Sequence, residues 1–94
     1  MNQIEHMMKL YEDALEELMG AQKYAKCAHK TEDTDDKTMY RGMAKQELEH
    51  AHNFIRSGDR LFNSADSMDS MKMVWTSLRQ HLLDWHADIT HKLG

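Results

Sequence analysis

The residues best suited to chemistry in this 94-residue chain are a glutamate and a histidine three positions apart, Glu47 and His50, in the segment KQELEHAH. Helical geometry allows side chains at this spacing to reach a common point beside the helix. Glu47 projects near the middle of the helix's apolar arc, flanked by Phe54, Tyr40 and Ala51, whereas His50 lies at its edge. We therefore expect Glu47 to be buried. A buried carboxylate is unfavourable unless it is paired, protonated or bound to a cation.

A second carboxylate, Glu17, lies on the flank of an earlier apolar face, in the segment EELMGAQKYA, where Gly20 leaves room beside it. Glu17 and Glu47 are nearly equidistant from a turn centred near residue 32, so antiparallel packing should bring them level with each other. Two facing acids repel unless a metal ion or a proton lies between them. Glu17 opposite Glu47 and His50 therefore predicts part of a carboxylate-bridged metal site.

The competing interpretation is a non-catalytic helical interaction module with no bound metal. In that case Glu47 pairs with a lysine or arginine of a neighbouring helix, His50 is a surface residue, and the apolar stripe of the third helix docks a partner. A Glu-x-x-His spacing on its own is common in helices, and the position of Glu17 is what favours the metal site.

An all-α fold must position these residues, because the chain has no proline and only four glycines and is rich in helix-forming residues. We expect a single domain over 1–94, built as an antiparallel helical hairpin plus a third helix. The 3.6-residue apolar period predicts helices from Ile4 to about Ala28, from a cap at Asp33 or Thr34 to about Ser57 or Leu61, and, after a turn within 57–67, to Lys92 or Leu93. The third apolar stripe comprises Met71, Val74, Trp75, Leu78, Leu82, Trp85, Ile89 and Leu93.

Residues 14–56 resemble the ferritin-like di-iron proteins, in particular rubrerythrins and the short encapsulated ferritins. The resemblance is carried by Glu17 with Ala21 and Tyr24, followed by AKQELEHAHNF with Glu47 and His50. A complete site in this family takes a Glu from each of two helices and a Glu-x-x-His from each of two others. This chain contains half of that set, and its third helix has no glutamate. The resemblance thus implies a ferritin-like four-helix bundle completed by a homodimer or a larger homo-oligomer.

The resemblance also assigns roles to the matched residues. Glu17 and Glu47 would be terminal or bridging metal ligands, His50 a terminal nitrogen ligand, and Tyr24 a hydrogen-bond partner of a carboxylate. The implied cofactor is iron, two ions per dimer, and the implied activity is oxidation of Fe(II) with oxygen or peroxide. Manganese or zinc would fit the same ligands.

Composition argues against several other classes of protein. The net charge is -4 and the lysines and arginines are scattered, so no nucleic-acid partner is expected. No segment is apolar enough for membrane insertion. The single Cys27 rules out an intrachain disulfide framework and favours a cytoplasmic location. His81 and Asp88, on one flank of the third helix, are interpreted as a solvated edge rather than as a further metal site.

Overall fold

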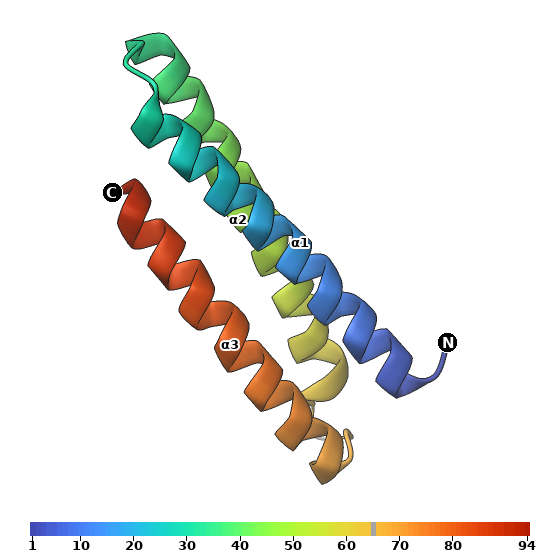
Figure 1. Ribbon diagram of the computed structural model, residues 1–94. Coiled ribbons are helices and arrows are strands. Elements are labelled where there is room, and N and C mark those ends of the chain that lie inside the picture. Colours follow the sequence, from blue (N-terminus) through green and yellow to red (C-terminus); the bar gives the residue numbers. More distant parts are fainter. Residues whose placement is uncertain (65) are drawn as a thin grey trace.

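The described residues of the chain form three α-helices. The computed structural model describes residues 1–64 and 66–94, which contain α1 (Gln3–Lys30), α2 (Thr34–Phe62) and α3 (Asp69–Leu93). The first two helices form an antiparallel hairpin, and α3 runs alongside the hairpin (Figure 1). The predicted all-α fold, a hairpin plus a third helix, is confirmed for the described residues.

Side-chain caps define where the first two helices begin. The Asn2 side chain accepts a hydrogen bond of 2.8 Å from the backbone N–H of Glu5, and Asp33 accepts one of 2.9 Å from the N–H of Asp36. These bonds satisfy N–H groups that have no partner within the helix. Asp33 is therefore the cap of α2, one of the two residues predicted for this position, and only residues 31–33 connect the two helices.

The second helix continues past Gly58, where the sequence had suggested that a turn could begin. Gly58 is buried against Trp75 of α3, and a Cβ atom at Gly58 would lie 2.6 Å from Trp75 Cε2 and closer still to Cζ2 and Cη2. Glycine at this position permits close packing of α2 against Trp75, and α2 continues beyond it to Phe62. The connection to α3 instead occupies residues 63–68, of which residue 65 lies outside the described residues.

The buried side chains between α1 and α2 differ in size from those that α3 contributes to the core. Buried alanines, including Ala14, Ala21, Ala44 and Ala51, allow α1 and α2 to pack closely, whereas α3 contributes large side chains. Trp75 is fully buried, which confirms its predicted role in the core. Val74 was predicted to belong to the apolar stripe of α3 but is 50% exposed, because α3 rests on the hairpin along one side only.

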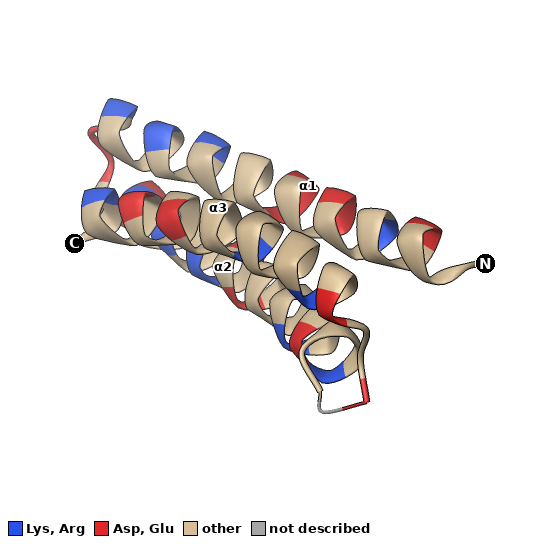
Figure 2. Cartoon of the chain, turned by 90° about the horizontal axis from the view of Figure 1, so that it is seen from below, with Lys and Arg blue, Asp and Glu red and all other residues tan. Residues whose placement is uncertain are grey.

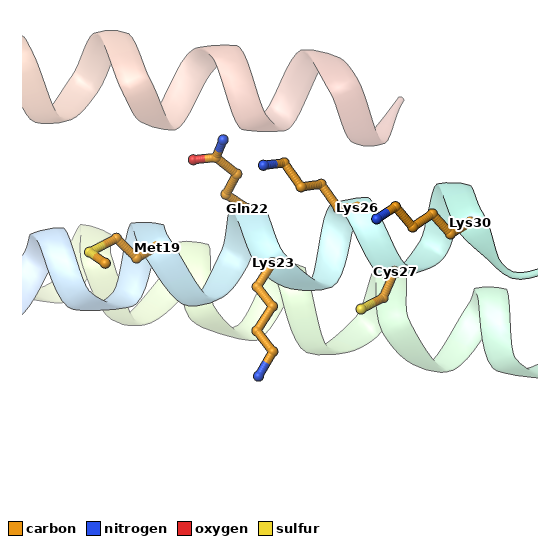
Figure 3. A pocket seen from close by; sticks show the side chains of 6 residues that line it. All are labelled: Met19, Gln22, Lys23, Lys26, Cys27 and Lys30. Atoms are coloured by element: carbon orange, nitrogen blue, oxygen red, sulfur yellow. The ribbon is translucent and has the colours of Figure 1, made fainter.

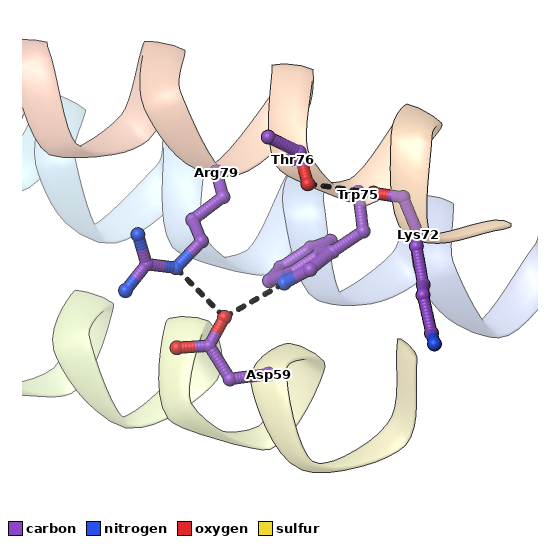
Figure 4. A network of polar contacts seen from close by, with 5 residues as sticks. All are labelled: Asp59, Lys72, Trp75, Thr76 and Arg79. Carbon is purple, nitrogen blue, oxygen red and sulfur yellow. Dashed lines mark hydrogen bonds and ion pairs between the residues drawn. The ribbon is translucent and has the colours of Figure 1, made fainter. Parts of the chain in front are cut away.

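Polar contacts attach α3 to both helices of the hairpin. On α2, the Asp59 carboxylate accepts hydrogen bonds of 2.8 Å from Trp75 Nε1 and from Arg79 Nε (Figure 4). On α1, the Tyr11 hydroxyl lies 2.6 Å from His81 Nδ1. His81 is therefore engaged in a helix contact, and Asp88 pairs with Lys92 at 2.9 Å. None of the helices in residues 1–64 and 66–94 combines the length and apolar character needed to cross a membrane.

Candidate metal centre

Three potential metal ligands meet between α1 and α2. Glu17 comes from α1, Glu47 and His50 come from α2, and one ligand atom of each lies within 4.8 Å of the other two. His50 Nδ1 lies 3.4 Å from Glu17 Oε2. The positions of these residues about the turn at 31–33 thus bring them together, as the sequence predicted.

None of the three candidate ligands is fully buried. The Glu17 side chain is 26% exposed, the His50 side chain is 55% exposed, and Glu47 is also incompletely buried. The expectation that Glu47 is buried is therefore wrong for a single chain. The reason is that the side of the hairpin on which these residues lie carries no third helix, so water retains access to the carboxylates.

The residues of α1 and α2 that contact α3 show which way the candidate ligands point around each helix. On α2, His52 packs edge-on against His86 of α3, with ring centroids 5.9 Å apart. His50 lies two residues from His52 and therefore points about 160° away from it around the helix. On α1, Glu17 lies about 120° around the helix from Tyr11, which contacts α3. Glu47 lies five residues from His52 and points about 140° away from it, so the three candidate ligands face away from these contacts with α3.

The contact between the Glu17 and Glu47 carboxyl groups favours a positive charge placed between them. A hydrogen bond between the Glu47 and Glu17 carboxyl groups is the largest cause that raises the pKa of Glu47 above its ordinary value of 4.5. Partial burial and the negative charge of Glu17 raise this pKa further, while His50 lowers it. The two carboxyl groups therefore lie where a metal cation between them would neutralise their negative charge.

Glu47 lacks the basic partner that the competing interpretation requires. Across the described parts of the chain, no lysine or arginine forms an ion pair with the Glu47 carboxylate. The acidic residues of α1 lie between Glu5 and Glu17, and its lysines other than Lys9 follow between Lys23 and Lys30 (Figure 2). Glu17 is part of the acidic segment, which favours the approach of a cation.

Tyr24 takes a different part in the structure from the one that the resemblance implied. Its ring stacks on Tyr40 of α2, with centroids 6.3 Å apart and an interplanar angle of 22°. Within residues 1–64 and 66–94, the structure shows no hydrogen bond from the Tyr24 hydroxyl to a carboxylate. The stack was not predicted, although Tyr24 and Tyr40 are equidistant from residue 32 and the same counting that paired Glu17 with Glu47 would have found it.

The donor set suits iron but is incomplete. Two carboxylates and one imidazole are the ligand types that bind Fe(II), and they bind manganese and zinc as well. Three donors from one chain leave coordination positions for other ligands. The residues present therefore fit half of a carboxylate-bridged di-metal site.

A separate hollow on α1 does not have the character of a metal site. Three lysines contribute ammonium groups to its lining, which disfavours a cation (Figure 3). The partly buried Cys27 is also part of this lining. The residues around the hollow are Met19, Gln22, Lys23, Lys26, Cys27 and Lys30.

Comparisons of this chain with protein-family models, with curated proteins and with solved structures find no match. The indications of function are therefore the convergence of Glu17, Glu47 and His50 and the sequence resemblance.

Proposed function

We propose that this protein binds iron through Glu17, Glu47 and His50 at the interface of a homodimer and oxidises Fe(II) with oxygen or peroxide. The observation that carries the proposal is the convergence of the three side chains within 4.8 Å, with no lysine or arginine paired to Glu47 among the described residues. Two carboxyl groups held together, with His50 beside them and no lysine or arginine paired to Glu47, are stabilised by a proton or a metal ion between them.

The homodimer follows from the incomplete ligand set and from the face on which it lies. Glu17, Glu47 and His50 point away from α3, so a second hairpin can pack over them without displacing α3. A twofold axis through that interface would place two Glu17, Glu47 and His50 sets around a pair of metal ions. The result would be the four-helix di-iron site of the ferritin-like proteins that the sequence resembles.

In this arrangement each side chain has a distinct task. The Glu17 and Glu47 carboxylates would hold the cations and stabilise the higher charge of Fe(III), while His50 would supply a nitrogen ligand from the more exposed edge. Bound iron would supply the one-electron steps by which two Fe(II) ions reduce oxygen or peroxide. Glu47 and Glu17 would bind the cation as carboxylates, since metal ligands must be deprotonated.

The competing function, a helical module that docks a partner through α3, receives less support. The apolar stripe of α3 packs against the hairpin through Trp75, Leu82 and Ile89, all of which are buried. Most of this stripe is therefore engaged within the chain, and Val74 is the member that stays half exposed.

Metal content tests the binding site directly. Protein purified without a histidine tag after iron supplementation should contain about one metal ion per chain, or two per dimer. Glu47→Ala and His50→Ala should lose this metal and retain helicity. Glu49→Ala is the matched control because Glu49 is an exposed residue of the same helix. Absence of metal from the wild-type protein would instead support the non-catalytic module.

Assembly and oxidation test the remaining parts of the proposal. Sedimentation should show a dimer or a larger assembly, and a stable metal-bound monomer would contradict the shared site. Aerobic addition of Fe(II) should produce near-ultraviolet Fe(III) absorbance faster than buffer does. Glu17→Ala should slow this reaction strongly and Tyr24→Phe only mildly, because Tyr24 is not a ligand. Equal rates in wild type and Glu17→Ala would remove α1 from the reaction.

A further inference from the structure

Gly20 of α1 lies directly against the side chain of Glu47. A Cβ atom built at Gly20 would meet Glu47 Oε2 at 2.7 Å, Cδ at 3.3 Å and Cγ at 3.5 Å, and these three atoms are its nearest neighbours. The carboxyl group of Glu47 therefore occupies the space that any side chain at position 20 would take. Gly20 is also three residues from Glu17, so it lies on the same part of α1 as the acid that Glu47 faces.

We propose that Gly20 is a positioning residue for the metal centre, which fixes the place of the Glu47 carboxylate opposite Glu17. This inference rests on the proposed metal-binding function. The distance of 2.7 Å is 0.7 Å short of the 3.4 Å at which ordinary contact of a Cβ atom begins. An alanine would therefore push the carboxylate away from α1 and from Glu17. Ligand distances in metal sites hold to within about 0.2 Å, so a displacement of this size breaks the arrangement.

The backbone of α1 does not itself require glycine at this position. No glycine among the described residues has a positive φ angle, and Gly20 lies well inside a 28-residue helix. Alanine is a better helix former than glycine at an interior position because it restricts the unfolded chain more. Glycine at position 20 thus weakens the helix, and the contact with Glu47 gives a reason for its presence.

Another glycine provides a matched control. At Gly42 on α2 a Cβ atom would meet no heavy atom within 4 Å. Gly42→Ala is therefore the same chemical change, also inside a long helix, without the contact to a ligand. Gly58 is not suitable as a control because a Cβ atom there would collide with Trp75.

The first measurement is Fe(II) binding under anaerobic conditions, with free and bound iron separated by ultrafiltration. Gly20→Ala should retain the helicity of the wild-type protein and lose Fe(II) affinity by about tenfold or more, the size of effect seen when the support of a metal ligand is removed. Gly42→Ala should bind as the wild type does. Wild-type affinity in Gly20→Ala would overturn the positioning role, whereas a wild-type protein that binds no Fe(II) would overturn the metal site itself.

A thermal unfolding cycle on metal-free protein tests the contact independently of iron. With Glu47 present, the added methyl group of Gly20→Ala collides with the carboxylate. In a Glu47→Ala background the collision is gone, so Gly20→Ala should raise the melting temperature there more than it does in the wild-type background. Equal shifts in the two backgrounds would show that Glu47 does not depend on Gly20. This cycle also separates the positioning role from a general structural role, since a structural glycine would behave alike in both backgrounds.

Discussion

Gly58→Ala should loosen the attachment of α3 while leaving the ligand residues in place. The added methyl group would lie 2.6 Å from Trp75 Cε2 and still closer to two other ring atoms, and the ring is fully buried, so it has no free space into which to move. Any shift of the ring also disturbs the 2.8 Å hydrogen bond from Trp75 Nε1 to Asp59, which Arg79 shares (Figure 4).

The size of the effect follows from three contributions. Overpacking a closely packed site destabilises a protein by about 1–3 kcal/mol. Weakening a hydrogen bond to a charged group adds about 1 kcal/mol, and the better helix propensity of alanine returns about 1 kcal/mol. The expected net loss is about 2 kcal/mol, which for a domain of this size lowers the melting temperature by roughly 8–16 °C.

Thermal unfolding followed by circular dichroism measures this difference, with Gly42→Ala as the control. Because a Cβ atom at Gly42 meets no neighbour, that variant should be stabilised by about 0.5–1 kcal/mol. Fe(II) binding by Gly58→Ala below its melting temperature should match the wild type, since α3 lies away from Glu17, Glu47 and His50. A Gly58→Ala protein as stable as the wild type would refute the close packing of α2 on Trp75.

Three further predictions concern charge and burial. The pKa of His52 lies below its ordinary value of 6.5, chiefly because of partial burial and then because of Arg56, His86 and Arg79, with Asp59 acting in the opposite direction. The folded protein therefore takes up a proton on His52 less readily than the unfolded chain does, so its free energy of unfolding should fall as the pH drops below about 6.5. Urea unfolding between pH 5 and 8 should show a shallower fall of this free energy for His52→Gln than for the wild type. An identical pH dependence in the two proteins would contradict this. Glu47→Leu should raise the stability of metal-free protein by about 1 kcal/mol, because it removes a carboxyl group held against Glu17, and should abolish iron binding; retention of iron would exclude Glu47 as a ligand. Asp59→Ala should destabilise the protein by about 1–3 kcal/mol by leaving Trp75 Nε1 without its acceptor, as measured by urea unfolding, and Asn63→Ala, on an exposed residue beyond the helix end, should have little effect.

Much of the fold is encoded locally and could be predicted from the sequence. The apolar period and the Asp33 cap placed the first two helices within a few residues of their observed limits, since both signals act within one or two turns. The pairing of Glu17 with Glu47 needed only the position of one turn. These features do not depend on how α3 packs.

The features that sequence analysis missed depend on contacts between helices. From the local sequence, Gly58 suggests a helix end. In the structure it packs against Trp75 of α3, a neighbour that the local sequence does not indicate. The burial of Glu47 was overestimated because a helical projection cannot show whether another helix covers the apolar arc. Val74 belongs to the correct periodic pattern, but the width of the contact between α3 and the hairpin decides that it is exposed.

The short connection between α1 and α2 has a consequence for the order of folding. With only residues 31–33 between them, the two helices close a small loop, and their contacts have low sequence separation near the turn. We expect the hairpin to form early and α3 to dock afterwards, when Trp75 packs against Gly58. Glu17, Glu47 and His50 all belong to the hairpin, so they would be assembled on the early unit, and two such hairpins could bind metal between them before their last helices have docked. Bound iron should then slow the unfolding of the hairpin more than it changes the rate at which α3 docks.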